Sequence, residues 1–169
     1  MEVISNSGPL MALGKLNLLY LLKRLYGKVI ISDSVYKETV TAGKIKGAQD
    51  ALTIELFLTQ NKWNPVEVNT KEIDPEIRLL RLDDGEIESI HLAMKISNSL
   101  ILLDDEEARK EARRKGLKIK GTIGVLVEAY QRDMINLEEL KLFLNEISER
   151  RDIWISKELC QTVLMELKK

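Results

Sequence analysis

The chain has 169 residues, of which 44% are hydrophobic and 31% charged, and its formal net charge is −1. This length suits one domain with its own core, and the near-zero charge argues against a protein that coats nucleic acid through bulk attraction. The single cysteine, Cys160, excludes an internal disulfide, and the opening residues lack a signal-peptide pattern, so we expect a cytoplasmic location.

The first predicted unit is a strand followed by a long helix. The apolar residues 3–5 indicate a strand, and Asn6 and Ser7 follow it directly. A helix is predicted over 9–26, with leucines at helical spacing and Gly27 at its end. Because polar and charged residues interrupt its apolar stretch, we expect a helix of the protein core and no membrane span.

The same order of strand and helix repeats in the next part of the chain. A strand over 29–31 leads to a helix over 35–41, which carries Glu38 one turn inside. The remaining predicted elements of this part are a basic loop at 43–47, an amphipathic helix over 48–60 with Leu52, Leu56 and Thr59 along one side, an edge strand at 63–68 and a short helix over 74–81.

Residues 82–109 combine two helix starts with one strand, and each helix start carries carboxylates. The helix that begins near residue 84 is apolar on most sides, which indicates that it is buried. The strand over 100–103 ends where a highly charged helix over 105–115 begins. If this strand is central and parallel, its carboxyl end opens onto the crevice where α/β sheets bind ligands. The acids at the two helix starts are Asp83, Asp84, Glu86, Asp104 and Asp105.

The repeated order of strand and helix predicts the fold class. The last elements expected are a strand over 117–119, a helix capped by Thr122, and helices over 137–149 and 157–168. We predict an α/β fold, a three-layer α/β/α sandwich with a parallel central sheet. One domain is expected over 1–169, with its core over about 1–132 and C-terminal helices over about 137–168.

Two interpretations of the acidic residues are open. Carboxylates at helix N-termini often do no more than accept hydrogen bonds from free backbone N–H groups. Alternatively, the strand ends near Asn6 and Asp104 meet at one sheet edge, and neighbouring helices add Glu38 and Glu86. Oxygen ligands of this kind suit Mg²⁺ or Mn²⁺. Zinc is disfavoured, because the chain has one cysteine and one histidine, and His91 lies on an apolar helix stripe.

A basic stretch follows the second acidic cluster. Residues 109–120 contain seven lysines or arginines. They form either a solvated helix face with internal ion pairs or a track for a phosphate backbone beside the acids. The residues that we single out as candidate RNA ligands are Arg109, Arg113, Arg114 and Lys118.

Four segments of the chain together resemble the PIN-domain family, and more closely a VapC-like subgroup from prokaryotes. They are VISNSGPLMALGKLNLLYLL, VIISDSVYKETV, LDDGEIESIHLA and LILLDDEEARKEARRKGLKIKGTIGVL. The resemblance lies in their order and spacing and runs from about residue 3 to 132. The rest of the chain matches only loosely.

The resemblance implies an α/β/α fold, a Mg²⁺- or Mn²⁺-dependent ribonuclease, and a toxin that is paired with a protein antitoxin. It also implies a homodimer and RNA as the substrate. The family's acidic positions fall on Asn6, Glu38, Glu86 and Asp105, with Ser7 as the adjoining hydroxyl and Asp104 as a second acid beside the last position.

One position departs from the family pattern, because Asn6 stands where an aspartate is usual. An amide oxygen can still bind a metal, but the site loses one negative charge. The chain is then a weakened or inactive member, a deliberately disarmed toxin, or an enzyme in which the remaining acids suffice.

Our leading hypothesis is a metal-dependent endoribonuclease of toxin type, and the alternative is a non-catalytic module that binds RNA or a protein. A third hypothesis, a phospho-acceptor domain, has little support, because Asp33 is placed inside a helix cap and does not stand alone at a strand end.

Overall fold

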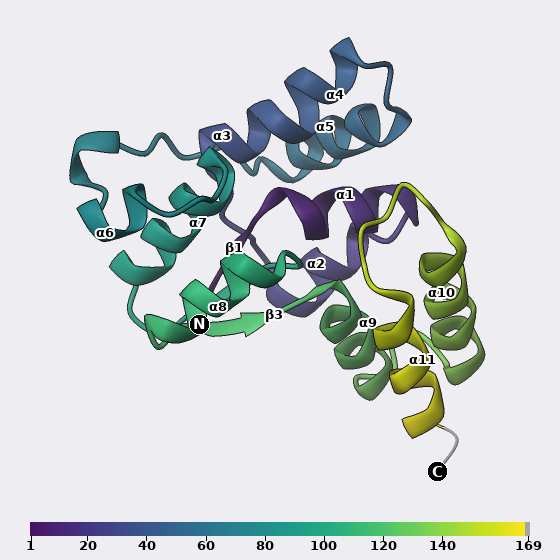
Figure 1. Ribbon diagram of the computed structural model, residues 1–169. Helices are drawn as coiled ribbons and strands as arrows, with labels where there is room; N and C mark the ends of the chain where they lie inside the picture. Colours follow the sequence, from purple (N-terminus) through teal and green to yellow (C-terminus); the bar gives the residue numbers. More distant parts are fainter. Residues whose placement is uncertain (168–169) are drawn as a thin grey trace.

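A parallel sheet of three strands organises the chain, and the computed structural model describes residues 1–167 (Figure 1). The strands β1 (Glu2–Ser5), β2 (Ser99–Leu102) and β3 (Lys118–Lys120) lie side by side in the order β1-β2-β3. Val3 pairs with Leu100, and Leu100 pairs in turn with Lys118. The sequence predicted all three strands to within about one residue.

Two further predicted strands are reduced to single bridges. Ile30 pairs with Ile4 beyond β1, and Val66 pairs with Ser32 beyond Ile30. The backbone N–H of Asp33 already donates to Val66 and opens a helix, so the pairing at 29–31 cannot extend. The strand predicted over 63–68 is limited in addition by Pro65, which has no N–H to donate.

Helices cover both faces of the sheet, as the prediction of three layers requires. Because neighbouring side chains of a strand point to opposite faces, Val3 and Leu102 join one hydrophobic cluster while Ile4 and Ile101 join another. A strand buried on both faces favours apolar residues at successive positions, which explains the uninterrupted apolar run over 100–103. Within residues 1–167, no helix is long and apolar enough to cross a lipid bilayer.

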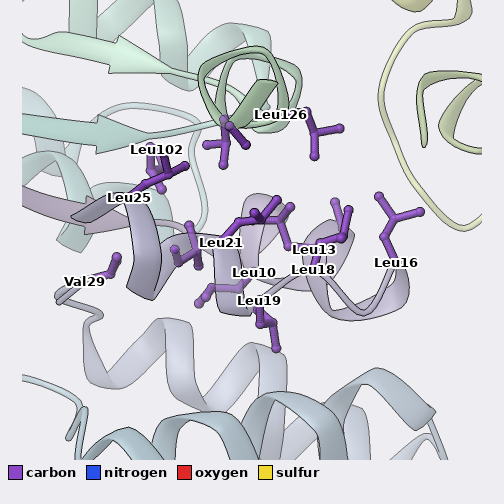
Figure 2. Packing of buried hydrophobic residues seen from close by; sticks show 14 of the residues in the cluster. Leu10, Leu13, Leu16, Leu18, Leu19, Leu21, Leu25, Val29, Leu102 and Leu126 are labelled. Carbon is purple, nitrogen blue, oxygen red and sulfur yellow. The ribbon is translucent and has the colours of Figure 1, made fainter. Parts of the chain in front are cut away.

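The helix predicted over 9–26 is in fact two helices. The elements α1 (Ser7–Lys15) and α2 (Tyr20–Tyr26) are separated at Asn17, whose φ of 57° lies in the left-handed region. Asparagine tolerates this conformation better than most residues. The chain changes direction at Asn17, although the helical spacing of the leucines continues past it. Figure 2 shows Leu10 and Leu21, one from each helix, in the same apolar cluster.

The segment after α2 is more helical than the sequence predicts. The helix α3 (Asp33–Tyr36), a π-helical turn (Lys37–Thr41) and α4 (Ala42–Ile45) run on without a break. The prediction of a loop at 43–47 is therefore wrong for residues 43–45, which are helical. A Cβ on Gly43 would lie 2.7 Å from the Cβ of Ala51, so glycine lets α4 approach the next helix closely.

The helix α5 (Gln49–Asn61) buries the side opposite to the predicted one. Ile54 and Leu58 are buried, whereas Leu52 and Leu56 are 59% and 57% exposed. Both sides of this helix carry apolar residues at helical spacing, so periodicity alone could not decide between them.

The remaining helices follow the prediction closely. They are α6 (Pro75–Arg78), α7 (Asp84–Lys95), α8 (Glu106–Arg114), α9 (Thr122–Gln131), α10 (Leu137–Glu149) and α11 (Lys157–Glu166), with a 3₁₀ turn at Thr70–Glu72. The helices α10 and α11 pack on the same cluster as α1 through Leu144 and Cys160. The predicted end of the last helix, Lys168, lies outside the described residues.

Candidate functional site

The carboxyl ends of β1 and β2 meet beside a small cavity. The backbone N–H of Asn6, which follows β1, donates to the carbonyl of Leu102 in β2 at 3.0 Å. The cavity has a volume of about 240 Å³. We call it the acidic cavity, because its lining includes Asp83, Glu86, Asp104 and Asp105 together with Asn6, Ser7 and Lys15. The expected meeting of residues from distant strand ends is therefore present.

Glu86 reaches the acidic cavity from the first turn of α7. Its carboxylate accepts the backbone N–H of Asp83 at 3.0 Å, and its own N–H donates to the Asp83 carboxylate at 2.8 Å. This reciprocal capping box orients the side chain, which is only 8% exposed. Burial, opposed by the Asp83 N–H and assisted by neighbouring carboxylates, raises the pKa of Glu86 to about 7.

Glu38 ties two of these segments together without lining the acidic cavity. Its carboxylate accepts hydrogen bonds from the Ser7 hydroxyl and, at 3.1 Å, from the backbone N–H of Gly85. A Cβ on residue 85 would lie 2.8 Å from both oxygens of Glu38, so any larger residue there would displace the Glu38 carboxylate from its present position. Burial raises the pKa of Glu38. The Ser7 hydroxyl is thus committed to Glu38.

The two adjacent aspartates have different surroundings. Asp104 accepts the backbone N–H and the hydroxyl of Thr122 at 2.7 and 2.6 Å, and burial raises its pKa. Asp105 is exposed and caps α8 by accepting the N–H of Ala108 at 2.9 Å. The predicted role of Thr122 as a helix cap is wrong, because Gly121 is the N-cap and the Thr122 hydroxyl is turned to Asp104.

Asn6 has the most unusual environment in the site. Its side chain is 4% exposed, and within residues 1–167 its Oδ1 accepts no hydrogen bond. A buried acceptor without a partner is costly, and such atoms are commonly satisfied by an ion or a water. Asn6 lines the same cavity as Glu86 and Asp105, and the side chains of all three carry oxygens, which hard divalent cations prefer.

The acids do not form a closed metal cage. Among residues 1–167, no three His, Cys, Asp or Glu side chains lie close enough together to hold an ion by themselves. Mg²⁺ commonly takes one or two carboxylates and completes its coordination with waters and substrate phosphate. An open set made of Glu86, Asp105 and the Asn6 amide fits that pattern of binding.

The predicted cationic residues are divided between two surroundings. Arg109 and Arg113 line a second depression of about 860 Å³, the adjoining groove, which shares Asp104 and Asp105 with the acidic cavity. Arg114 instead pairs with Glu111 at 2.8 Å, and Lys118 donates to Asn98 at 3.0 Å. Neither Arg114 nor Lys118 is among the residues that line the groove, whereas Lys120, which belongs to the predicted basic stretch but was not singled out, is.

Some features of the site were not predicted. Asp83 was named among the acids at the helix starts, but its capping role was not, although an aspartate three residues before Glu86 is the spacing of a capping box. Asp152 and Trp154 could not be predicted, because they come from the segment between α10 and α11, which has no periodic pattern. Only the packing of that segment beside α1 brings them to the acidic cavity (Figure 1).

Comparisons with known proteins agree with this geometry. A family model described as a PIN domain matches residues 2–169. Neither the curated proteins nor the solved structures contain a match. The family match spans nearly the whole chain, including both strand ends, the four acids and the C-terminal helices. The chain therefore belongs to the PIN-domain family.

Proposed function

We propose that the protein is a metal-dependent endoribonuclease that hydrolyses RNA phosphodiester bonds, and that it belongs to the VapC-like toxins. One observation carries the proposal: Asn6, Glu86 and Asp105, which come from three separate segments, line one cavity at the carboxyl ends of β1 and β2. Ligand sites of open α/β sheets are found at this edge.

The oxygens of Glu86, Asp105 and Asn6 would hold a Mg²⁺ or Mn²⁺ ion. When bound, such an ion lowers the pKa of a water and stabilises charge on the leaving oxygen of a phosphodiester. Glu86 is oriented for this role by Asp83, and Asp104 holds the start of α9 against the cavity through Thr122. Glu38 is a positioning residue, because it joins Ser7 to Gly85 and thereby fixes α1 relative to α7.

Asn6 weakens this site in a defined way. An aspartate at residue 6 would add a negative charge to the acidic cavity, whereas the amide offers a neutral oxygen. We therefore expect a lower affinity for Mn²⁺ and slower cleavage than in the Asn6→Asp variant. This expectation favours a weakened enzyme over an inactive one, since an oxygen ligand is retained at residue 6.

The test is cleavage of a single-stranded RNA in the presence of Mn²⁺. Activity should disappear with EDTA, fall by at least tenfold in Glu86→Gln, and rise in Asn6→Asp. Glu107→Gln is the matched control, because Glu107 is an exposed acid of α8 that pairs with Lys110 and does not line the acidic cavity. Equal activity in the wild type and Glu86→Gln would contradict the proposal.

A non-catalytic module that binds RNA or a protein is the second candidate. It is favoured by the neutral side chain at residue 6 and by the absence, among residues 1–167, of three acids close enough to hold an ion. It predicts RNA binding that is sensitive to salt, unchanged by EDTA and never followed by cleavage. A homodimer and an antitoxin that covers the acidic cavity are further proposals for either candidate.

A further inference from the structure

The segment between α10 and α11 holds an aromatic side chain at the site. We call residues 150–156 the C-terminal strap. Arg150 binds the Asp152 carboxylate at 2.8 and 2.7 Å and the carbonyl of Lys15 at 3.2 Å. Lys15 in turn donates to the Asp152 carbonyl, and Ile153 is buried in the main hydrophobic cluster. The strap is therefore fixed on α1, directly before Trp154.

Trp154 is 92% exposed although the strap that carries it is well anchored. Tryptophan is buried to a large extent in most proteins, so a fully exposed ring on a fixed backbone is informative. The other tryptophan, Trp63, is buried and packs edge-on against Phe57. Trp154 is among the lining residues of both the acidic cavity and the adjoining groove, so the residue lies where the two depressions meet.

The adjoining groove offers cations beside this ring. Arg109, Arg113 and Lys120 line it. The pair of Arg113 with Glu106, at 3.4 Å, is half exposed and can be exchanged for a phosphate at little cost. Exposed aromatic rings combined with cations along a groove are the common means of binding single-stranded nucleic acid, because bases stack on the ring while phosphates follow the cations.

We propose that Trp154 stacks on a base of single-stranded RNA and thereby positions the neighbouring phosphodiester at the acidic cavity, with the strand continuing along Arg109 and Arg113. This inference rests on the proposed function, since it assigns the substrate of that same site. A duplex is excluded from this contact, because its bases are already paired and stacked on one another. Trp154 is thus a positioning residue that selects unpaired RNA.

Binding of a labelled oligouridine in EDTA tests the inference without cleavage. Trp154→Leu should weaken binding by roughly five- to a hundredfold, the effect of one lost base–aromatic stack, and Trp154→Phe should restore most of it. A duplex RNA of equal length should bind weakly and equally to all variants. The single strand should also quench the fluorescence of Trp154, while buried Trp63 stays unchanged. Leu79→Ala is the matched control, because Leu79 is 85% exposed and lines neither depression.

The outcomes separate this inference from the proposed function when cleavage with Mn²⁺ is measured on the same variants. If the wild type cleaves and Trp154→Leu binds and cleaves with unchanged Kd and KM, the inference fails and the ribonuclease stands. If binding depends on Trp154 but no variant cleaves, the hydrolysis fails and the stacking contact stands. If the single strand binds no better than the duplex and leaves the fluorescence unchanged, the inference is overturned, and a protein partner at Trp154 becomes the better reading.

Discussion

Asn6→Asp is the most informative single change, because it restores a charge at a buried position. Residue 6 is 4% exposed and lines a cavity that already holds the carboxylates of Glu86 and Asp105. The burial of Glu86 beside this cavity raises its pKa from an ordinary value of 4.5 to about 7. A comparable shift for an aspartate at residue 6 corresponds to about 3 kcal/mol of lost stability when the group is ionised.

The sign of the pH dependence follows from the raised pKa. Below the unfolded-state pKa of about 4 the new carboxyl is protonated in both states, so Asn6→Asp should match the wild type in unfolding free energy. The cost grows as the pH rises above about 4, because the unfolded state ionises first, and it is complete once the pH exceeds the raised folded-state pKa. A bound divalent cation should remove the cost, since an ion at about 100 times its Kd stabilises the folded state by about 2.7 kcal/mol.

The assay is urea unfolding of the wild type and Asn6→Asp at pH 5 and pH 8, each with EDTA or with Mn²⁺. It gives the unfolding free energy under all four conditions. Asn145→Asp is the matched control, because Asn145 is exposed on α10 and does not line the acidic cavity. The reasoning is refuted if Mn²⁺ stabilises Asn6→Asp no more than it stabilises the wild type at pH 8.

Three further changes test the surroundings of the site. In EDTA, Glu86→Gln should gain stability relative to the wild type as the pH rises through about 7, because the wild type alone must then bury a charge; parallel pH profiles would contradict the role of burial. Gly85→Ala should lose about 1–3 kcal/mol in urea unfolding, although alanine usually favours a helix, and the loss should shrink when Glu38→Ala removes the clash. Thr122→Val should lose about 1.5–3 kcal/mol, because a buried carboxylate loses a hydroxyl donor, whereas Thr122→Ser should keep most of the stability; equal losses in both would show that the hydroxyl is unimportant.

Local sequence signals determined much of this fold. The apolar run of β2 predicts a strand buried on both faces, and the acid at residue 83 followed by Glu86 predicts the start of α7. The alternation of strand and helix predicts a parallel sheet, and a parallel sheet brings the ends of β1 and β2 to one edge. Each of these features depends on residues that are close together in the chain or on a rule that holds for all such folds.

Tertiary packing decided the surroundings of individual side chains, which differ even between adjacent residues of the same type. Asp104 and Asp105 look alike in sequence, yet Asp104 is held by Thr122 and Asp105 remains exposed. The sequence alone likewise could not place Trp154, which reaches the acidic cavity only because its strap is anchored on α1. The physical reason is the same in both cases: hydrogen bonds and burial between segments far apart in the chain depend on the folded distance between them, which no local pattern records.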